Sequence, residues 1–233
     1  MENGTENGTE SRKKRRRKNM IRILDVASMR ESDAATIAAG TPGRELMARA
    51  GKAIFEAGDW KPPVAVVCGK GNNAGDGYVL AKRMAEAGMD CTLFLQEESF
   101  SADGGFWFAQ CREAGIPVRM WRDTETLAGF GSVADCIFGT GFRGSVTGEA
   151  ARMIDLINGS GAYVVSADIN SGLNGDNGLA EKAVRSDLTV SVGFYQPGHF
   201  LNQAMDLMGR KVNCDIGIAP REFRERYRFS GTP

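Results

Sequence analysis

Three polar, glycine-rich segments contain the residue types that carry chemistry, and each directly follows an apolar run. Residues 69–77 read Gly-Lys-Gly-Asn-Asn-Ala-Gly-Asp-Gly, residues 139–144 read Gly-Thr-Gly-Phe-Arg-Gly, and residues 168–172 read Asp-Ile-Asn-Ser-Gly. The first segment contains a G-x-G-x-x-A pattern, in which backbone N–H groups at the start of a helix can bind a pyrophosphate. This pattern indicates a dinucleotide site, although by itself it is a weak indication.

Asp168 is the residue best placed for proton transfer. It follows the apolar run 163–167, and a carboxyl group at the end of a buried strand is desolvated by its neighbours. Desolvation raises the pKa of a carboxyl group, which suits it to act as a general acid or base. The alternative is that Asp168 only caps the turn that follows the strand.

The interior of the first segment is unusual for a redox protein. Asn72, Asn73 and Asp76 place two amides and a carboxylate where small residues usually stand. These side chains could instead serve a tight turn, with Asp76 favourable near the positive end of a helix. Glu97 and Glu98 follow the next apolar run, where many dinucleotide-binding folds have an acid that binds ribose. An NAD(P)-dependent oxidoreductase therefore stays open as an alternative.

Metal chemistry is restricted by the composition. The single histidine, His199, excludes sites that need two imidazoles, such as those of zincins and zinc deaminases; its place after Gln-Pro-Gly favours a structural role. Asn73, Asp135 and Ser171 would offer an amide oxygen, a carboxylate and a hydroxyl. Because Mg²⁺ and Ca²⁺ usually recruit more carboxylates, this set fits a monovalent cation better. The absence of G-x-S-x-G and Walker A sequences argues against serine hydrolases and P-loop kinases.

Alternating strands and helices must position these segments. Two helices are expected between residues 21 and 57, separated by Gly-Thr-Pro-Gly at 40–43. The later apolar runs, separated by helical patterns, predict an α/β protein, a three-layer αβα Rossmann-like sandwich with a mostly parallel sheet. Ligands in such folds bind at the carboxyl ends of the strands, near the point where strand order reverses. The expected strands are 64–68, 91–95, 118–121, 134–138, 163–167, 187–192 and 211–214, and the expected later helices are 75–87, 102–114, 149–158 and 200–208.

Length and composition limit the class of protein. The chain has 233 residues, 42% of them hydrophobic, and its longest apolar stretches fall short of the ~18 residues that a membrane span needs. A basic run from Arg12 to Lys18 predicts a disordered tail over residues 1–19, with Met20 as an alternative start. Residues 20–233 are expected to form one mildly acidic domain, so nucleic-acid binding is not expected. Five cysteines without a C-x-x-C pair, and no secretory pattern, predict reduced thiols and a cytoplasmic location.

Two motifs at the ends of separate strands are specific in combination. They read Asn-Asn-x-Gly-Asp-Gly at 72–77 and Asp-x-x-Ser-Gly at 168–172. Leu-Met-Ala-Arg-Ala-Gly at 46–51, Asp-Cys-Ile-Phe-Gly-Thr-Gly at 135–141 and Ala-Val-Arg-Ser-Asp-Leu-Thr-Val at 183–190 accompany them. From about residue 22 to 219, the sequence resembles the YjeF N-terminal domain family, the NAD(P)H-hydrate epimerases.

The resemblance implies a fold, an activity and a set of site residues. The fold is Rossmann-like, usually in a homodimer, and the activity interconverts the R and S forms of hydrated NADH and NADPH (NADHX and NADPHX). The dinucleotide is the substrate, so no redox cofactor is implied, and a separate NAD(P)HX dehydratase would complete the repair. Asp168 matches the acid proposed to be catalytic, and Asn73, Asp135 and Ser171 match the ligands of one K⁺ per subunit. The implied substrate-binding residues are Asn72, Asn73, Ala74, Gly75, Asp76, Gly139, Thr140, Gly141, Phe142, Arg143, Gly144, Ser145 and Asp168.

The chain departs from the family pattern at two positions. Asn170 stands where Pro is usual, and Gln196 stands where Lys is common. Neither is an implied catalytic or cation-binding residue, so the departures bear on rate more than on identity. A third alternative is a catalytically silent binding or dimerisation module of the same fold, although the retained Asp168 and Ser171 argue against it. The helices before Ala57 are candidates for the dimer surface.

Overall fold

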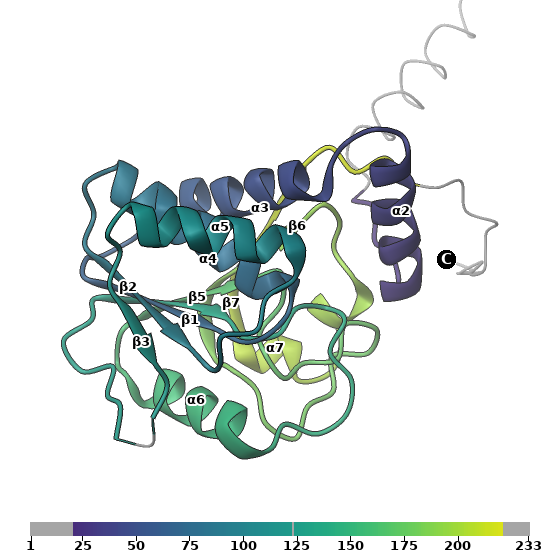
Figure 1. Cartoon of the computed structure of the whole chain (residues 1–233). Helices are drawn as coiled ribbons and strands as arrows, with labels where there is room; N and C mark the ends of the chain where they lie inside the picture. Colours follow the sequence, from purple (N-terminus) through teal and green to yellow (C-terminus); the bar gives the residue numbers. More distant parts are fainter. Residues whose placement is uncertain (1–20, 123, 221–233) are drawn as a thin grey trace, which may run out of the picture.

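The fold is that of a computed structural model, which describes residues 21–122 and 124–220. The expected tail over residues 1–19 and Met20 lie outside the described residues. Seven parallel strands form one sheet in the order β3-β2-β1-β4-β5-β6-β7 (Figure 1). The strands are β1 (Val64–Cys68), β2 (Cys91–Leu95), β3 (Val118–Met120), β4 (Ser132–Cys136), β5 (Tyr163–Ala167), β6 (Ser186–Val192) and β7 (Met208–Cys214).

Helices cover both faces of the sheet, so the predicted three-layer αβα sandwich is confirmed. One face carries α3, α4 and α5, and α6 lies on the other face (Figure 1). α2 stands at the end of the sandwich, beside the carboxyl ends of the strands. The helices are α2 (Val26–Ala38), α3 (Gly43–Ala57), α4 (Asn72–Glu86), α5 (Ala102–Glu113), α6 (Gly148–Gly159) and α7 (Ala204–Leu207), with a 3₁₀ turn η1 (Pro197–His199).

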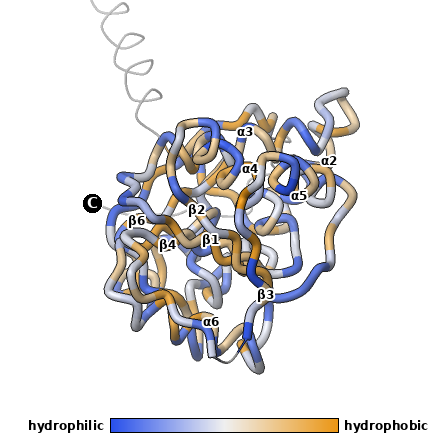
Figure 2. Tube along the Cα trace, turned by 60° about the vertical axis from the view of Figure 1, so that its left-hand side comes forward, coloured by the Kyte–Doolittle hydropathy of each residue, from blue (hydrophilic) through white to orange (hydrophobic). Residues whose placement is uncertain are grey.

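The strand β1 shows why the sheet lies inside. All five of its residues are buried, with Val64, Val66 and Cys68 packed toward α3–α5, and Ala65 and Val67 toward α6. Alternation of side chains between the two faces is the geometry of any strand, so a strand covered on both faces must be apolar throughout. The central strands accordingly form an apolar band within a more polar exterior (Figure 2). Burying each large aliphatic side chain contributes about 1.5–3 kcal/mol.

Several expected bounds differ from the structure: β7 starts at Met208 rather than at 211 and α4 at Asn72 rather than at 75, and two elements differ more. The strand expected over 134–138 is shifted, because β4 starts at the buried Ser132 and ends before Ile137. Asp135 therefore lies inside the strand, one residue before its end, rather than at its start. The expected helix over 200–208 is wrong over most of its length, because Asn202 has a φ of +49° and only Ala204–Leu207 is helical.

Other sequence expectations concern the thiols and the membrane. All five cysteines are free thiols, and four of them are buried. None of the helices formed by the described residues combines the length and the apolarity that crossing a membrane requires.

Candidate functional site

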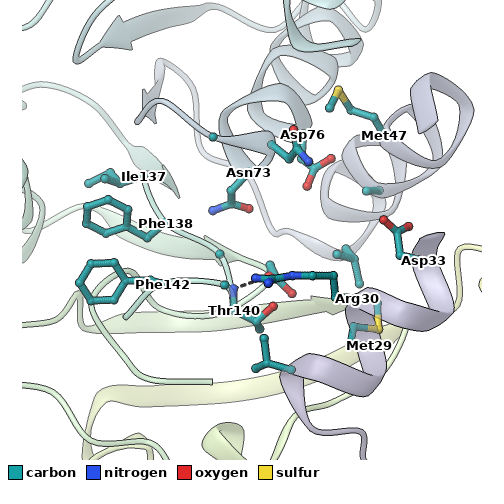
Figure 3. Close-up of a pocket in the computed structure, with 18 of the residues that line it drawn as sticks. Met29, Arg30, Asp33, Met47, Asn73, Asp76, Ile137, Phe138, Thr140 and Phe142 are labelled. Atoms are coloured by element: carbon teal, nitrogen blue, oxygen red, sulfur yellow. Dashed lines mark hydrogen bonds between the residues drawn. The ribbon is translucent and has the colours of Figure 1, made fainter. Parts of the chain in front are cut away.

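A cavity of about 720 Å³ opens at the carboxyl ends of the central strands. The strand order reverses between β1 and β4, and the loops that follow these two strands both line the cavity. This is the position at which open α/β sheets bind ligands. α2 forms the opposite wall, so that residues far apart in the sequence face one space (Figure 3).

Asp168 lies at the cavity wall directly after β5. Its backbone is left-handed, with a φ of +64°, and its N–H donates to the carbonyl of Val190 over 2.8 Å. Its Oδ2 accepts a hydrogen bond from the backbone N–H of Thr140 at 2.7 Å, marked in Figure 3 at Thr140. Burial raises the pKa of Asp168, and the hydrogen bonds from Thr140 oppose that rise. The carboxyl group is therefore fixed in place and holds a proton more readily than an exposed Asp.

Asn73 offers unused hydrogen-bonding capacity at the same wall. Its side chain projects from the first turn of α4 into the cavity (Figure 3). Both Oδ1 and Nδ2 are buried and have no hydrogen-bond partner among the described residues. An unsatisfied buried polar group costs about 1–3 kcal/mol, so this amide is suited to a ligand that would satisfy it.

Gly139 separates Asn73 from Asp168. A Cβ atom at this position would lie 2.7 Å from Asp168 Oδ2 and 3.7 Å from Asn73 Cγ. Since real Cβ atoms do not approach an oxygen so closely, any other residue would displace the carboxyl group. The glycine therefore lets the loop after β4 pass close to the acid.

Asp135 is fully buried behind the cavity wall. Its carboxylate accepts four hydrogen bonds, from Ser171 Oγ at 2.5 Å, the Ser171 N–H at 2.9 Å, Ser166 Oγ at 2.8 Å and the Ile137 N–H at 3.3 Å. Burial raises the pKa of Asp135 and these donors lower it. Among the described residues, donors alone and no basic side chain offset the effect of burial on this pKa. A cation bound nearby would balance the charge that the donors stabilise.

Three further carboxyl groups share the cavity with Asp168, and one of them, Asp103 on α5, is paired with Arg44 at 3.6 Å. Asp76 comes from the first turns of α4 and Asp33 from α2 (Figure 3). Burial raises the pKa of Asp76 well above its usual range, and the negative charges of Asp168 and Asp33 raise it further. Burial also raises the pKa of Asp33. Several protonatable groups therefore face one space.

The wall made by α2 contains site residues that the sequence analysis missed. Val26, Met29, Arg30, Asp33 and Ile37 line the cavity, spaced so that they share one face of the helix. That spacing, with two charged residues inside an otherwise apolar face, was the available indication.

Arg30 is the basic side chain in this wall. It reaches across the cavity toward Thr140 (Figure 3), and a Cβ atom at Gly141 would lie 3.5 Å from its Nη2. Lys70, also in the lining, is paired with Glu97 at 2.6 Å. Among the described residues of the lining, Arg30 is thus the cation without an acidic partner, and it is available to an anionic ligand.

Comparison with known proteins fits this arrangement. Residues 43–198 match the family described as YjeF-related protein N-terminus. The chain belongs to this family. The crystal structure of yeast ynu0 superposes on the YjeF-related domain with a TM-score of 0.70 over 88% of this chain and 98% of that one, at 17% identity, which confirms the fold.

Several relatives of this YjeF-related domain have names that describe their activity. The bifunctional NAD(P)H-hydrate repair enzyme Nnr of Coxiella burnetii is 31% identical over 84% of this chain and 41% of its own length. The Nnr of Archaeoglobus fulgidus is 35% identical over 76% of this chain and 38% of its own length. The NAD(P)H-hydrate epimerase of Oenococcus oeni is 31% identical over 77% of this chain and 88% of its own length. The chain therefore spans about two fifths of these bifunctional relatives but most of the epimerase.

The predicted site residues of this YjeF-related domain fall into two groups. The cavity brings together Asn72, Asn73, Asp76, Gly139, Thr140, Gly141, Phe142, Ser145 and Asp168. Those that do not line it are Ala74, Gly75, Asp135, Arg143, Gly144 and Ser171.

The residues outside the lining have other contacts. A Cβ atom at Gly75 would lie 2.5 Å from the Met47 side chain, so this glycine allows α4 to approach α3. Arg143 is paired with Asp176 at 2.6 Å. The other oxygen of Asp176 accepts the Val26 N–H at 2.8 Å, so one carboxylate joins the loop after β4 to the start of α2.

Proposed function

We propose that this YjeF-related domain is an NAD(P)H-hydrate epimerase that interconverts the R and S forms of NADHX and NADPHX. One observation carries the proposal: a fixed carboxyl group with a raised pKa, Asp168, faces a cavity large enough for part of a dinucleotide. The G-x-G-x-x-A segment at the start of α4 borders the same cavity. The names of the relatives support the same activity.

The chemistry needs one group that gives and then takes a proton. Hydrated NAD(P)H carries a hydroxyl on the ring carbon next to the nicotinamide nitrogen. When Asp168 protonates this hydroxyl, the C–O bond breaks, its electron pair leaves with water, and the nitrogen lone pair forms a C=N bond. Water then adds to either face of the planar iminium, and the Asp168 carboxylate takes back the proton. No electron is transferred to a cofactor.

The polar wall of the cavity suits the rest of the substrate. The dinucleotide would contact the residues of 72–76 and 139–145 named above, with its phosphates near the backbone N–H groups at the start of α4. Arg30 would add a charge-assisted hydrogen bond to a phosphate, because it lacks an acidic partner among the described residues. The nicotinamide ring would lie toward Asp168.

A monovalent cation fits the residues behind the acid. We assign K⁺, one per subunit, to Asn73, Asp135 and Ser171. The unpartnered Oδ1 of Asn73 and the buried charge of Asp135 support this assignment. The cation would supply charge balance and rigidity, whereas the proton transfers belong to Asp168.

The repair reaction implies further partners. We propose that the domain acts as a homodimer in the cytoplasm, and that a separate NAD(P)HX dehydratase consumes the S form. The bifunctional names of the Nnr relatives support a second activity that works with this one.

The decisive experiment is epimerisation of purified R-NADPHX, followed by chromatography. The wild-type chain should produce the S form, and Asp168→Asn should lower the rate by roughly 100- to 10,000-fold, the usual contribution of a general acid or base. Asp155→Asn, an exposed carboxylate on α6 paired with Lys182, is the matched control and should keep full activity. A folded wild-type protein that does not exceed the spontaneous rate would overturn the proposal.

A further inference from the structure

His199 lies directly behind Asp168, outside the cavity lining. It is fully buried in η1, and its ring packs edge-on against Tyr195 with centroids 5.3 Å apart. Its Nε2 is 2.9 Å from the backbone carbonyl oxygen of Asp168. The only imidazole of the chain therefore contacts the main chain of the proposed acid.

The hydrogen bonds of His199 define its tautomer. Nδ1 lies 3.1 Å from the Gln196 nitrogen, which donates to it, and 3.2 Å from the Gln196 carbonyl oxygen. A carbonyl oxygen can only accept, so Nε2 must carry a proton for its contact with Asp168 to be favourable. Nδ1 is then the acceptor of the Gln196 N–H. Burial lowers the pKa of His199, which keeps this tautomer neutral near pH 7.

The peptide that His199 contacts is strained. Asp168 has a φ of +64°, and a left-handed conformation costs about 1 kcal/mol or more for a residue other than glycine. Such a conformation persists only when the surroundings hold it. Three hydrogen bonds do so: the N–H to Val190, the carbonyl from His199, and the carboxylate from the Thr140 N–H.

We infer that His199 is a positioning residue for the reaction, whose Nε2–H fixes the strained peptide of Asp168 and thereby aims the carboxyl group into the cavity. The inference rests on the proposed function of Asp168. Without the Nε2 donor, the carbonyl loses its partner and the peptide can relax toward the right-handed region. The carboxyl group would then move away from Thr140, and a displacement of about 1 Å can cost roughly 100-fold in rate.

The test compares two substitutions of His199. In His199→Gln, the side-chain Nε2 can reach the same carbonyl, whereas His199→Asn is too short to do so. We expect His199→Asn to lower kcat by about 100-fold with KM within about twofold, and His199→Gln to restore most of kcat. Equal kcat values for both variants and the wild type, in folded proteins, would overturn the inference.

A second measurement is independent of activity. The Thr140 amide proton, which bonds to Asp168 Oδ2, should move upfield in the ¹H–¹⁵N spectrum of His199→Asn and stay in place in His199→Gln. An unchanged Thr140 resonance in both variants would overturn the inference even if the proposed epimerase activity were absent. A moved resonance in a chain without activity would instead retain the positioning role and reject the proposed function.

If His199→Asn does not fold whereas His199→Gln does, the substitution Asp168→Gly provides a second test of the link between His199 and the strained peptide. Glycine adopts a positive φ without strain, so the same backbone should form in Asp168→Gly without help from His199. His199→Asn combined with Asp168→Gly should then fold, and its failure to do so would overturn the link between His199 and the strained peptide.

Discussion

The carboxyl ends of β4 and β5 carry two aspartates, side by side in the sheet, in different surroundings. Asp135 is closed in, with four hydrogen-bond donors on its two oxygens. Among the residues that the structure describes, Thr140 alone donates to the carboxyl group of Asp168, which faces the cavity. Burial raises the pKa of both groups, but the donors around Asp135 favour its charged form.

The difference between the two strand ends separates an enclosed carboxyl group from one that faces the cavity. Four donors contact Asp135, and it does not line the cavity, so it has little access to a ligand with which to exchange a proton. The carboxyl group of Asp168 accepts from fewer donors: within the described part of the chain, its Oδ2 accepts the Thr140 N–H and no other residue donates to this group. Because it lines the cavity, it is accessible to a ligand. Access and the number of donors, rather than burial alone, therefore distinguish the two roles.

The sharpest test of this comparison measures the stability of Asp135→Asn against that of Asp168→Asn. Asn offers one acceptor oxygen to four donors, so Asp135→Asn should lower the free energy of unfolding by about 3 kcal/mol. For a domain of this size that corresponds to a Tm decrease of roughly 6–12 °C. Asp168→Asn should stay within about 1 kcal/mol of wild type. Calorimetric traces that coincide for the two variants would contradict the contrast between the strand ends.

Removal of K⁺ should lower the stability of the folded chain through the site at Asp135. At a concentration ten times the Kd, a cation that binds only the folded chain adds about 1.4 kcal/mol to its stability. The Tm should therefore rise by about 3–6 °C when choline chloride is replaced by KCl at equal ionic strength. Asn73→Ala should abolish this rise, because it removes the unpartnered amide oxygen. Equal Tm values in the two salts would reject the cation assignment.

Arg30→Met should weaken ligand binding at the open side of the site. Loss of one charge-assisted hydrogen bond predicts about tenfold weaker binding of ADP-ribose by calorimetry. Arg119→Met, which affects an exposed arginine on β3 paired with Glu125 at 3.8 Å, is the matched control. A loss restricted to 2′-phospho-ADP-ribose would place Arg30 at the 2′-phosphate rather than the pyrophosphate. No loss with either ligand would exclude Arg30 from phosphate binding.

The smallest expected effect is a pH-dependent change in stability when Asp76 is replaced by Asn. Its pKa is raised in the folded chain, so the folded state keeps a proton that the unfolded state loses. The stability associated with Asp76 is thus fully present below its unfolded pKa of about 3.8 and declines as pH rises through the folded pKa. Asp76→Asn removes that decline and should raise the Tm at pH 7.5 by about 2–4 °C, or ~1 kcal/mol. The gain should shrink toward pH 4, and a gain independent of pH would contradict the explanation.

Local patterns predicted most of the sheet. The bounds of β1, β2 and β5 coincide with apolar runs that end at polar or glycine residues. The range expected for β4 began two residues too late, because the first residue of the strand, Ser132, is polar yet buried. Its hydroxyl accepts the Lys61 N–H at 2.7 Å. Hydropathy alone does not detect a strand residue whose polar group is satisfied by a distant segment.

The site was predictable where it lies in loops and not where it depends on long-range packing. The segments at 69–77, 139–144 and 168–172 do meet at one edge of the sheet, as parallel strands require. The contribution of Arg30 and Asp33 depends on how α2 packs at the end of the sheet, which no local pattern specifies. The contact between His199 and Asp168 joins residues 31 positions apart, and the structural role favoured for His199 gave no indication of that partner.

Asp176 has a consequence for the order in which the chain folds. Its carboxylate accepts the N–H of Val26, 150 residues earlier in the sequence, and pairs with Arg143. During synthesis, α2 leaves the ribosome long before Asp176 is made. The start of the helix therefore cannot form this contact until the segment after β5 has been synthesised. Contacts between residues so far apart in the sequence form late, because a long loop must close, at a cost in conformational entropy, before the contact can stabilise the fold. The α2 wall of the cavity is therefore among the last parts of the molecule to assemble, and the cavity is not closed on that side before the domain is nearly complete.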